Sequence, residues 1–578
     1  MNINTSSVSP LSHRACGCHK PAPRPSQDSA PSDQVQLSNQ QPPQQPPSQT
    51  PPQDPPPQDP PPQQPPAPSP NIKVNVYAQD PFVSGPILLD FERSKIGENL
   101  SGPRVHVTDP GRTVIRADEN GNYLAAPNTD GIAQLNSFTA TYKTLDLFER
   151  YRGSKIDWAF GSESIDVTPH KQEGRNAYYS RWEGGTNFFY FDSPGLNAHV
   201  RTANSADIVS HETGHALLDG LRPGFFGTWD PETGGFHEAF GDCAAMLYCL
   251  DEANSNDKLM QQTGGSLRHH NVLSSLAEEF GAASKRDNSN PDDDHKTWLR
   301  TALNSFTYVD PSELPPGRGD EDHLGREVHS FSRLFSGAFY DVLENIYMKA
   351  IYDDRQCPQE ALKTASDVAG PALVKAIESG SSSRARYKEI ALGMIRADQE
   401  NGGHYAEAIK SAFLKREIVT PADFEQEEAR LAALPKLELN QPLNPEQAAE
   451  FVASKAKELG LPEGANLETL DVHTNKAGEQ FLSLRYTEEA PVVGVEGYEG
   501  FTIDAQNGVT LVFGADGKLK NFVHDRADLD AEMRGIADMK GSNAIADSNQ
   551  SIFASHDGSI FKAVARGNKL VRVPISSC

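Results

Sequence analysis

The stretch SADIVSHETGHALLDGL, at residues 205–221, decides how this chain is interpreted. We expect a helix over residues 205–220, and His211 and His215 lie four residues apart within it. That spacing places both imidazoles on one face, one turn apart, within reach of a single tetrahedral zinc ion. Glu212 follows the first histidine, so its carboxylate can reach a zinc-activated water without being a ligand. The stretch therefore predicts two metal ligands and a general base.

A surface helix with incidental histidines is the competing interpretation. The chain has 17 histidines, so an H-E-x-x-H pattern arises by chance in roughly a few per cent of such sequences. Chance leaves Gly214 unexplained, because a glycine inside a helix costs about 1 kcal/mol relative to alanine. A metal centre explains it, since a small residue lets the helix pack closely beside the metal.

The segment GFHEAFGD, at residues 235–242, supplies a candidate for the third ligand. A catalytic zinc takes three protein ligands and leaves its fourth position to water. Glu238 and Asp242 lie four residues apart on the next expected helix, so Glu238 can bind the metal. Asp242 can then accept the free ring N–H of a ligand histidine and fix its tautomer. His237 is the alternative third ligand, and we favour Glu238 because Asp242 lies at the matching spacing.

Together these motifs resemble the thermolysin-like zinc peptidases, which combine H-E-x-x-H with a glutamate from a following E-x-x-x-D helix. The resemblance extends over residues 105–420 and is most specific at 207–242. It implies a zinc-dependent endopeptidase with an α+β catalytic domain, strand-rich in its first half and helical in its second. The implied zinc ligands are His211, His215 and Glu238, with Glu212 as the general base.

The resemblance also implies roles outside the ligand set. GRNAYYSRWEGG, at 174–185, is similar to the family's substrate-binding edge strand, in which Asn176 and Ala177 would bond the peptide backbone. GREVHSFSRLF, at 325–335, resembles the segment whose histidine donates to the tetrahedral intermediate, which assigns that role to His329. Asp219 matches an aspartate that ends the active-site helix, and we expect it, with Asp242, behind the ligands.

The sequence departs from the family pattern at the two oxyanion donors. A tyrosine usually stands between the second histidine and the glutamate ligand, but residues 216–237 hold Phe225 and Phe226 instead. The aspartate partner expected shortly before His329 is displaced, and Asp320 or Asp322 is its expected substitute. If His329 has no such partner, it is simply a histidine at the start of a helix.

Calcium is a further cofactor that the resemblance raises. The family's paired calcium site needs an acidic cluster, and none is visible after Asp242. Asp207 alone cannot hold a calcium ion, which takes 6–8 oxygen ligands. The loop RDNSNPDDD, at 286–294, is a candidate calcium site, with a solvated acidic loop as the alternative.

Composition divides the chain into four parts. Residues 1–70 form a Pro/Gln-rich tail that we expect to be disordered, because it has too few apolar residues to offset its ordering entropy. Its P-x-x-P patterns could bind an SH3-like partner, although a simple spacer is the plainer interpretation. Residues 71–205 are the strand-rich half and 206–434 the helical half. Residues 440–578 follow a Pro-rich break as a small α+β accessory domain.

Secondary structure within the catalytic region follows from periodicity. Alternating residues predict strands at NIKVNVYA (71–78), RVHVTD (104–109), TVIRAD (113–118), IDVTPH (165–170) and NFFYFD (187–192). Apolar residues at helical spacing predict helices at 137–152, 205–220, about 236–252, 328–352, 359–378, 384–399 and 404–415.

The accessory domain should begin with a helix at 446–459 and continue as strands. FTIDAQNGVTLVFGADGKLKNFV, at 501–523, reads as consecutive hairpins with Asn-Gly and Asp-Gly turns. The segment loosely resembles the strand-rich pro-domain modules of the same family, moved to the C-terminus. It would then fold over or chaperone the catalytic domain, and a substrate-docking domain is the plainer alternative.

Charge and hydropathy exclude some classes of partner. The net charge of -26 repels phosphate backbones and anionic lipid, so we expect protein or peptide substrates and no nucleic acid or membrane partner. No apolar run has the length of a transmembrane helix or of a signal peptide. The expected location is the cytoplasm, or outside the cell by a signal-independent route.

Two other functions compete with the endopeptidase. The missing tyrosine and the absent signal are compatible with a catalytically weak zinc protein that binds peptides or partners. A zinc hydrolase acting on non-peptide amides is the second competitor. The expected edge strand argues against it, because a small substrate needs no extended row of backbone partners.

Overall fold

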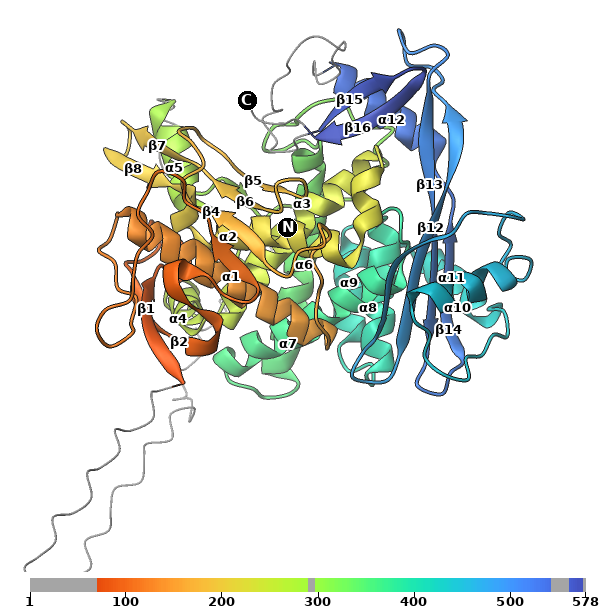
Figure 1. Cartoon of the computed structure of the whole chain (residues 1–578). Helices are drawn as coiled ribbons and strands as arrows, with labels where there is room; N and C mark the ends of the chain where they lie inside the picture. The colour runs from red at the N-terminus through yellow and green to blue at the C-terminus, as the bar shows by residue number, and fades with distance from the viewer. Residues whose placement is uncertain (1–69, 289–296, 542–560, 575–578) are drawn as a thin grey trace, which may run out of the picture. The chain divides into compact units, whose positions relative to one another are not determined.

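The computed structural model describes residues 70–288, 297–541 and 561–574, and the chain has a mixed α/β fold (Figure 1). The Pro/Gln-rich tail therefore lies outside the described residues, as does most of the acidic loop at 286–294. No helix in the described ranges has both the length and the apolar character needed to cross a membrane.

The first part of the chain contains small sheets around one long helix. Its main sheet has the order β3-β4-β6-β5, in which β5 is an antiparallel edge strand. The elements are β1 (Asn71–Val76), β2 (Ile87–Glu92), β3 (Val105–Val107), α1 (Asp130–Arg152), β4 (Ile165–Thr168), β5 (Ala177–Ser180), β6 (Gly185–Phe188), β7 (Tyr190–Ser193) and β8 (Ala198–Arg201). Short 3-10 turns are η1 (Arg93–Lys95), η2 (Glu98–Leu100), η3 (Thr202–Asn204) and η4 (Pro223–Gly227).

Helix α1 begins earlier than the expected range 137–152. Its first turns carry polar residues that are nevertheless buried, such as Gln134 and Asn136, so apolar periodicity does not mark them. The Gln134 side chain accepts from the Ile115 backbone N–H (2.9 Å) and donates to the Thr113 carbonyl (3.2 Å). The strand expected at 113–118 is therefore wrong, because this segment bonds to a helix side chain instead of a neighbouring strand.

The middle of the chain is helical, as expected, and two-residue strands are its only described β structure. The helices are α2 (Ala206–Leu221), α3 (Pro231–Asp251), α4 (Ala253–Thr263), α5 (Glu278–Asp287), α6 (Val328–Tyr352), α7 (Pro358–Ser379), α8 (Tyr387–Glu400), α9 (Ala406–Lys415) and α10 (Pro421–Ala432). The strands β9 (Ser275–Leu276) and β10 (Arg300–Thr301) pair with each other. Helices α4, α5 and α10 were not expected.

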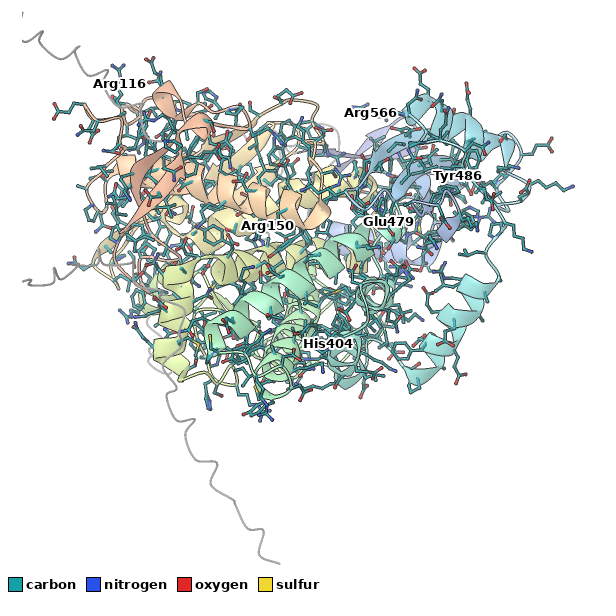
Figure 2. The ribbon with its side chains drawn as sticks, turned by 90° about the horizontal axis from the view of Figure 1, so that it is seen from below. Arg116, Arg150, His404, Glu479, Tyr486 and Arg566 are labelled. Carbon is teal, nitrogen blue, oxygen red and sulfur yellow. The ribbon has the colours of Figure 1, made fainter. Side chains whose placement is uncertain are left out.

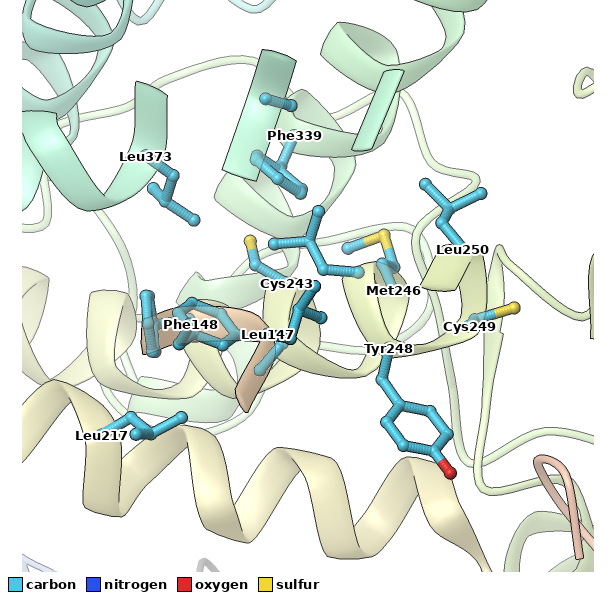
Figure 3. Close-up of a cluster of buried hydrophobic side chains, with 14 of the residues drawn as sticks. Leu147, Phe148, Leu217, Cys243, Met246, Tyr248, Cys249, Leu250, Phe339 and Leu373 are labelled. Atoms are coloured by element: carbon cyan, nitrogen blue, oxygen red, sulfur yellow. The ribbon is translucent and has the colours of Figure 1, made fainter. Parts of the chain in front are cut away.

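One apolar core joins these helices to α1. Figure 3 shows Phe148 of α1, Leu217 of α2, Met246 of α3, Phe339 of α6 and Leu373 of α7 around it, and all five are at most 1% exposed. Burying each such side chain contributes about 1.5–3 kcal/mol. Because α3 packs between α2 and α6, this core sets the spacing of the three helices that carry the candidate site.

The described residues of the C-terminal region (residues 440–578) build a six-stranded sheet with its own apolar cluster. The sheet order is β11-β12-β13-β16-β15, with β14 also paired to β13. Its elements are α11 (Pro445–Ser454), β11 (Glu468–Thr474), β12 (Gln480–Pro491), β13 (Thr502–Phe513), β14 (Leu519–Asp525), α12 (Leu529–Gly541), β15 (Phe561–Arg566) and β16 (Lys569–Pro574). Leu482, Leu511 and Phe513 are among the buried residues of its core.

The hairpin expected at Asn507-Gly508 is wrong, whereas the turn at Asp516-Gly517 is present between β13 and β14. Strand β13 runs straight through Asn507 because that side chain is buried and accepts from the Ala527 backbone N–H (2.9 Å). A Cβ on Gly508 would lie 2.7 Å from the Ser382 hydroxyl. The glycine therefore serves a close approach between the C-terminal sheet and the α7–α8 connection, not a turn.

A buried ion network joins the C-terminal region to the helical part. The Arg152 guanidinium lies 2.7 Å from the Glu378 carboxylate on α7 and 2.7 Å from the Asp471 carboxylate on β11. Nearby, the Lys375 ammonium of α7 pairs at 3.0 Å with Glu479, which is labelled in Figure 2. The described residues from both parts belong to one compact unit.

We predict that Arg152→Met lowers the free energy of unfolding by about 3–5 kcal/mol, because it leaves the buried Glu378 carboxylate without its partner. Arg150→Met is the matched control on the same helix. Its side chain is 52% exposed and pairs with Asp251, so its loss should change stability by less than about 1 kcal/mol. Urea unfolding followed by fluorescence measures both, and equal losses would contradict the prediction.

Candidate metal centre

Three helices bring the sequence-predicted site residues together. Helix α2 carries His211, Glu212 and His215, α3 carries Glu238, and His329 lies in the first turn of α6. The start of α3 is fixed locally: Pro231 occupies its first turn, where a missing N–H has no consequence, and the Asp230 side chain caps it.

The potential ligand atoms of His211, His215 and Glu238 all lie within 4.8 Å of one another. His211 Nε2 is 3.5 Å from Glu238 Oε2, and His215 Nε2 is 3.6 Å from Glu238 Oε1. Two imidazole nitrogens and one carboxylate oxygen converging from two helices form a donor set of the kind that catalytic zinc takes. The residues present therefore fit zinc.

Two glycines allow α2 and α3 to cross this closely. A Cβ on Gly214 would lie 3.0 Å from the Ala244 Cβ and 3.1 Å from the Gly241 Cα. A Cβ on Gly241 would meet the His211 ring at 2.6 Å. Gly214 inside α2 is thus required for close packing, here against α3, and Gly241 leaves room for the His211 ring.

Asp242 lies behind the first ligand, as expected. Its Oδ1 is 3.1 Å from His211 Nδ1, and its Oδ2 accepts from the Ser336 hydroxyl at 2.7 Å. This contact holds the His211 ring so that Nε2 faces the other ligands. Among the acids that the sequence placed behind the ligands, Asp242 is the one in contact with them.

Asp219 is not behind the ligands, and that expectation is wrong. Its carboxylate accepts from the Tyr179 hydroxyl (2.7 Å) and from Arg181 Nε (2.7 Å). Asp219 lies two turns beyond His211, at the far end of α2. Its contacts instead fasten the end of α2 to strand β5 and the residue that follows it.

His237, the alternative third ligand, contacts the second histidine from behind. The Nδ1 atoms of His237 and His215 are 2.9 Å apart, while His215 Nε2 faces Glu238. His237 therefore orients the His215 ring. The Phe226 ring stands edge-on to His237, with ring centroids 4.7 Å apart, and presents no hydroxyl at this place.

Strand β5 lies at the edge of its sheet, beside Glu212. The Asn176 carbonyl accepts from the Phe189 N–H (3.1 Å), so its backbone groups face β6. In an antiparallel ladder, alternate residues turn their backbone groups to opposite sides. Those of Ala177 and Tyr179 therefore face outward, and the Tyr179 backbone lies close enough to the Glu212 carboxylate to favour its charged form.

The Glu212 side chain is a buried carboxyl whose pKa lies near neutral pH. Burial raises its pKa to about 7, partly opposed by the charge of His211 and reinforced by that of Glu238. A general base works best when its pKa lies near the operating pH.

His329 reaches the same centre from α6. Its Nε2 lies 3.3 Å from Glu238 Oε2, and its Nδ1 lies 2.6 Å from Glu327 Oε1. Burial alone would lower the pKa of His329, but the charges of Glu238 and Glu327 outweigh burial and the net pKa is raised. Both carboxylates therefore favour the charged, doubly donating form of the imidazole.

Asp320 and Asp322, the expected partners of His329, make other contacts. The Asp320 carboxylate lies 2.7 Å from His323 Nδ1 and also accepts from the Asp322 backbone N–H. Glu327 takes their place because it is the N-cap of α6, where its side chain also accepts from the Ser330 N–H (3.0 Å). An acid immediately before an expected helix start was the available signal.

Arg300 is a site residue that the sequence did not reveal. Its Nη1 lies 3.3 Å from Glu238 Oε2 and its Nη2 lies 3.0 Å from Asp242 Oδ1. It arrives on β10, a two-residue strand that is too short to leave a pattern in the sequence. Arg300 adds a positive charge to a centre that holds three buried carboxylates.

A second group of acids surrounds Asp207, contrary to the expectation that no cluster accompanies it. Asp80 and Glu278 are buried, and Glu279 lies beside them, with its backbone N–H bonded to Asp80 (3.0 Å). Burial and the charge of Asp80 raise the pKa of Asp207 to about 8, and the same two causes raise that of Glu279 to about 8. The adjacent acids Glu278 and Glu279 are visible in the sequence, but only the fold brings them close to Asp207.

Another set of potential ligands, Glu378, Asp471 and His473, also lies within 4.8 Å. The Arg152 guanidinium already contacts all three, at 2.7, 2.7 and 2.8 Å. This arginine ties the three side chains together at the junction between the two parts of the chain.

Comparison with known proteins yields no relative: no family model and no curated protein matches this sequence. The geometry of the site is therefore what indicates a function. That geometry combines three converging ligands, a buried carboxyl, a paired histidine and the outward edge of a strand.

We predict that stability without divalent cations falls as the pH rises from 6 to 9, and falls less steeply in Asp207→Asn. The pKa of about 8 for Asp207 exceeds its unfolded value of about 3.9. Its contribution is therefore complete below about pH 4 and is lost as the pH rises through 8. Each pKa unit of difference corresponds to about 1.4 kcal/mol.

Urea unfolding at a series of pH values measures this slope. Asp257→Asn, which changes an exposed acid on α4, is the matched control and should follow the wild type. Calcium that binds the cluster would restore stability at pH 9 in the wild type more than in Asp207→Asn. Parallel curves for the wild type and Asp207→Asn would contradict the prediction.

Proposed function

We propose that this protein is a zinc-dependent endopeptidase with a thermolysin-like catalytic domain. The observation that carries the proposal is the convergence of His211, His215 and Glu238 beside Glu212 at the outward edge of β5. When bound, zinc supplies Lewis acidity that polarises a carbonyl and lowers the pKa of a water. His211, His215 and Glu238 would hold it.

Strand β5 would bind the substrate. An extended peptide can pair with an exposed strand edge through backbone hydrogen bonds, largely independently of its side chains. The outward backbone groups of Ala177 and Tyr179 supply such partners. The Tyr179 backbone lies beside Glu212, so a peptide on this edge would place a carbonyl close to the general base.

Glu212 would move the protons. Its raised pKa allows it to accept a proton from the attacking water and then to release it to the leaving amine. His329, whose pKa is raised by the charges of Glu238 and Glu327, would donate from Nε2 to the oxyanion of the tetrahedral intermediate. Arg300 contributes further positive charge at the same centre.

A catalytically weak zinc protein that binds peptides is the alternative, and one observation favours it. Phe226 presents no hydroxyl beside the second ligand, and losing one oxyanion donor typically reduces rates by about 10²–10³. A hydrolase of small amides receives less support, because the strand edge offers more backbone partners than a small substrate uses.

We predict that Glu212→Gln abolishes casein cleavage, reducing it at least about 10²-fold, while zinc content stays near one per chain. The amide cannot accept a proton, yet Glu212 is not in the ligand set. Glu119→Gln, which changes an exposed glutamate in the segment before α1, is the control and should cleave like the wild type.

Cleavage by Glu212→Gln at the wild-type rate would refute the role of Glu212. If the wild type and the variant both bind zinc and neither cleaves, the peptide-binding alternative replaces the endopeptidase.

A further inference from the structure

Helix α12 of the C-terminal region contacts the segment that leads into α3. The Glu532 carboxylate, which is 3% exposed, accepts from the Thr228 hydroxyl at 2.5 Å and from the Trp229 backbone N–H at 2.7 Å. Trp229 directly precedes Asp230, the N-cap of α3. The carboxylate therefore holds the backbone at the point where the helix carrying Glu238 begins.

Apolar packing at the same place is specific in shape. The Trp229 side chain lies in a buried cluster with Ile503, Ile536 and Leu570 of the C-terminal region. A Cβ on Gly535 would stand 1.7 Å from the Trp229 carbonyl oxygen, a separation that no packed structure tolerates. Helix α12 can thus sit here only because it has a glycine at this position.

The same helix also contacts the segment that leads into α6. Two hydrogen bonds, of 2.6 and 2.8 Å, join the Arg326 guanidinium to the Asp538 carboxylate. Arg326 also donates to the Leu314 carbonyl (3.1 Å), which ties the preceding loop to the same point. The next residue is Glu327, which caps α6 and holds His329.

We propose that α12 is a clamp that positions the metal centre, with Glu532 and Asp538 as positioning residues for Glu238 and His329. The proposal rests on the proposed function, since it assigns the C-terminal region a part in that reaction. A helix is rigid over its first turns, so fixing its N-terminal end fixes the side chains it carries. Two helices that carry site residues are thus held by one element, through contacts that span 303 residues to the start of α3 and 212 residues to the start of α6.

The clamp differs from both roles expected for this region. A pro-domain or lid would have to leave before substrate enters, whereas the contacts of α12 fall on the starts of α3 and α6. A docking domain would change the affinity for substrate. A clamp changes the rate of the chemical step, because a displacement of about 1 Å in a catalytic group can cost roughly 10² in rate.

The test is Asp538→Asn in the full chain loaded with zinc. We expect kcat for a peptide substrate to fall about tenfold, with KM and zinc content within twofold of the wild type. Hydrogen exchange of peptides spanning 314–330 should accelerate, a readout that needs no activity. Asp530→Asn, an exposed acid on the same helix, is the matched control and should change neither quantity.

A double-mutant cycle separates positioning from general damage. If Asp538 acts through His329, Asp538→Asn should lower kcat no further in a His329→Ala background, because the group it positions is already gone. If Asp538→Asn does not fold, Arg326→Lys keeps the charge but loses the two-bond geometry, and the same exchange and kcat changes are expected.

Unchanged exchange at 314–330 would overturn the clamp, and so would faster exchange with an unchanged kcat. A fully additive loss of kcat in the His329→Ala background would overturn the positioning role. If the wild-type protein binds zinc but cleaves nothing, the proposed function fails by itself. In that case the exchange comparison between Asp538→Asn and Asp530→Asn still decides whether α12 holds the segment.

Discussion

The close crossing of α2 and α3 is the constraint on which the rest of the centre depends. Gly214 and Gly241 face each other there, and a Cβ on either would displace the neighbouring helix or the His211 ring. Only at this separation can two histidines on one helix and Glu238 on the next approach within 4.8 Å. The glycine in α2 costs about 1 kcal/mol of helix propensity, and the surrounding apolar core offsets that cost.

The electrostatics of the centre follow from its burial. Three carboxylates are buried around the two ligand histidines, and ionised groups out of water need partners. Arg300, His329 and Ser336 supply them, so the pKa of Glu238 and that of Asp242 are lowered even though burial by itself raises both. Glu212 has weaker compensation, and its pKa rises instead. The Glu238 and Asp242 carboxylates are therefore held in their charged forms, whereas the proposed base can exchange a proton near neutral pH.

The organisation around the centre extends well beyond the helices that carry it. Strand β5 lies along one side, fastened to α2 by Asp219, and the C-terminal region meets the starts of α3 and α6. The buried network around Arg152 joins the same two parts of the chain at another place. A chain that holds its site from several directions can keep ligands and proton-transferring groups in register, which is what precise chemistry requires.

The sequence by itself determined the features that depend on local spacing. The i, i+4 pairs His211/His215 and Glu238/Asp242 placed potential ligands on shared helix faces, and apolar periodicity marked the long helices. Asp-Gly correctly marked a turn, but Asn507-Gly508 did not, because burial and a close approach to Ser382 override local turn preference. The start of α1 was missed because its buried residues are polar.

Only the tertiary structure decided which residues meet across long separations. Arg300 reaches Glu238 from a strand of two residues, Glu327 replaces the expected Asp320 and Asp322 beside His329, and Asp80 and the 278–279 pair join Asp207. The physical reason is that such contacts are set by packing between distant segments. They leave no periodicity along the chain, whereas a pair of ligands on one helix does.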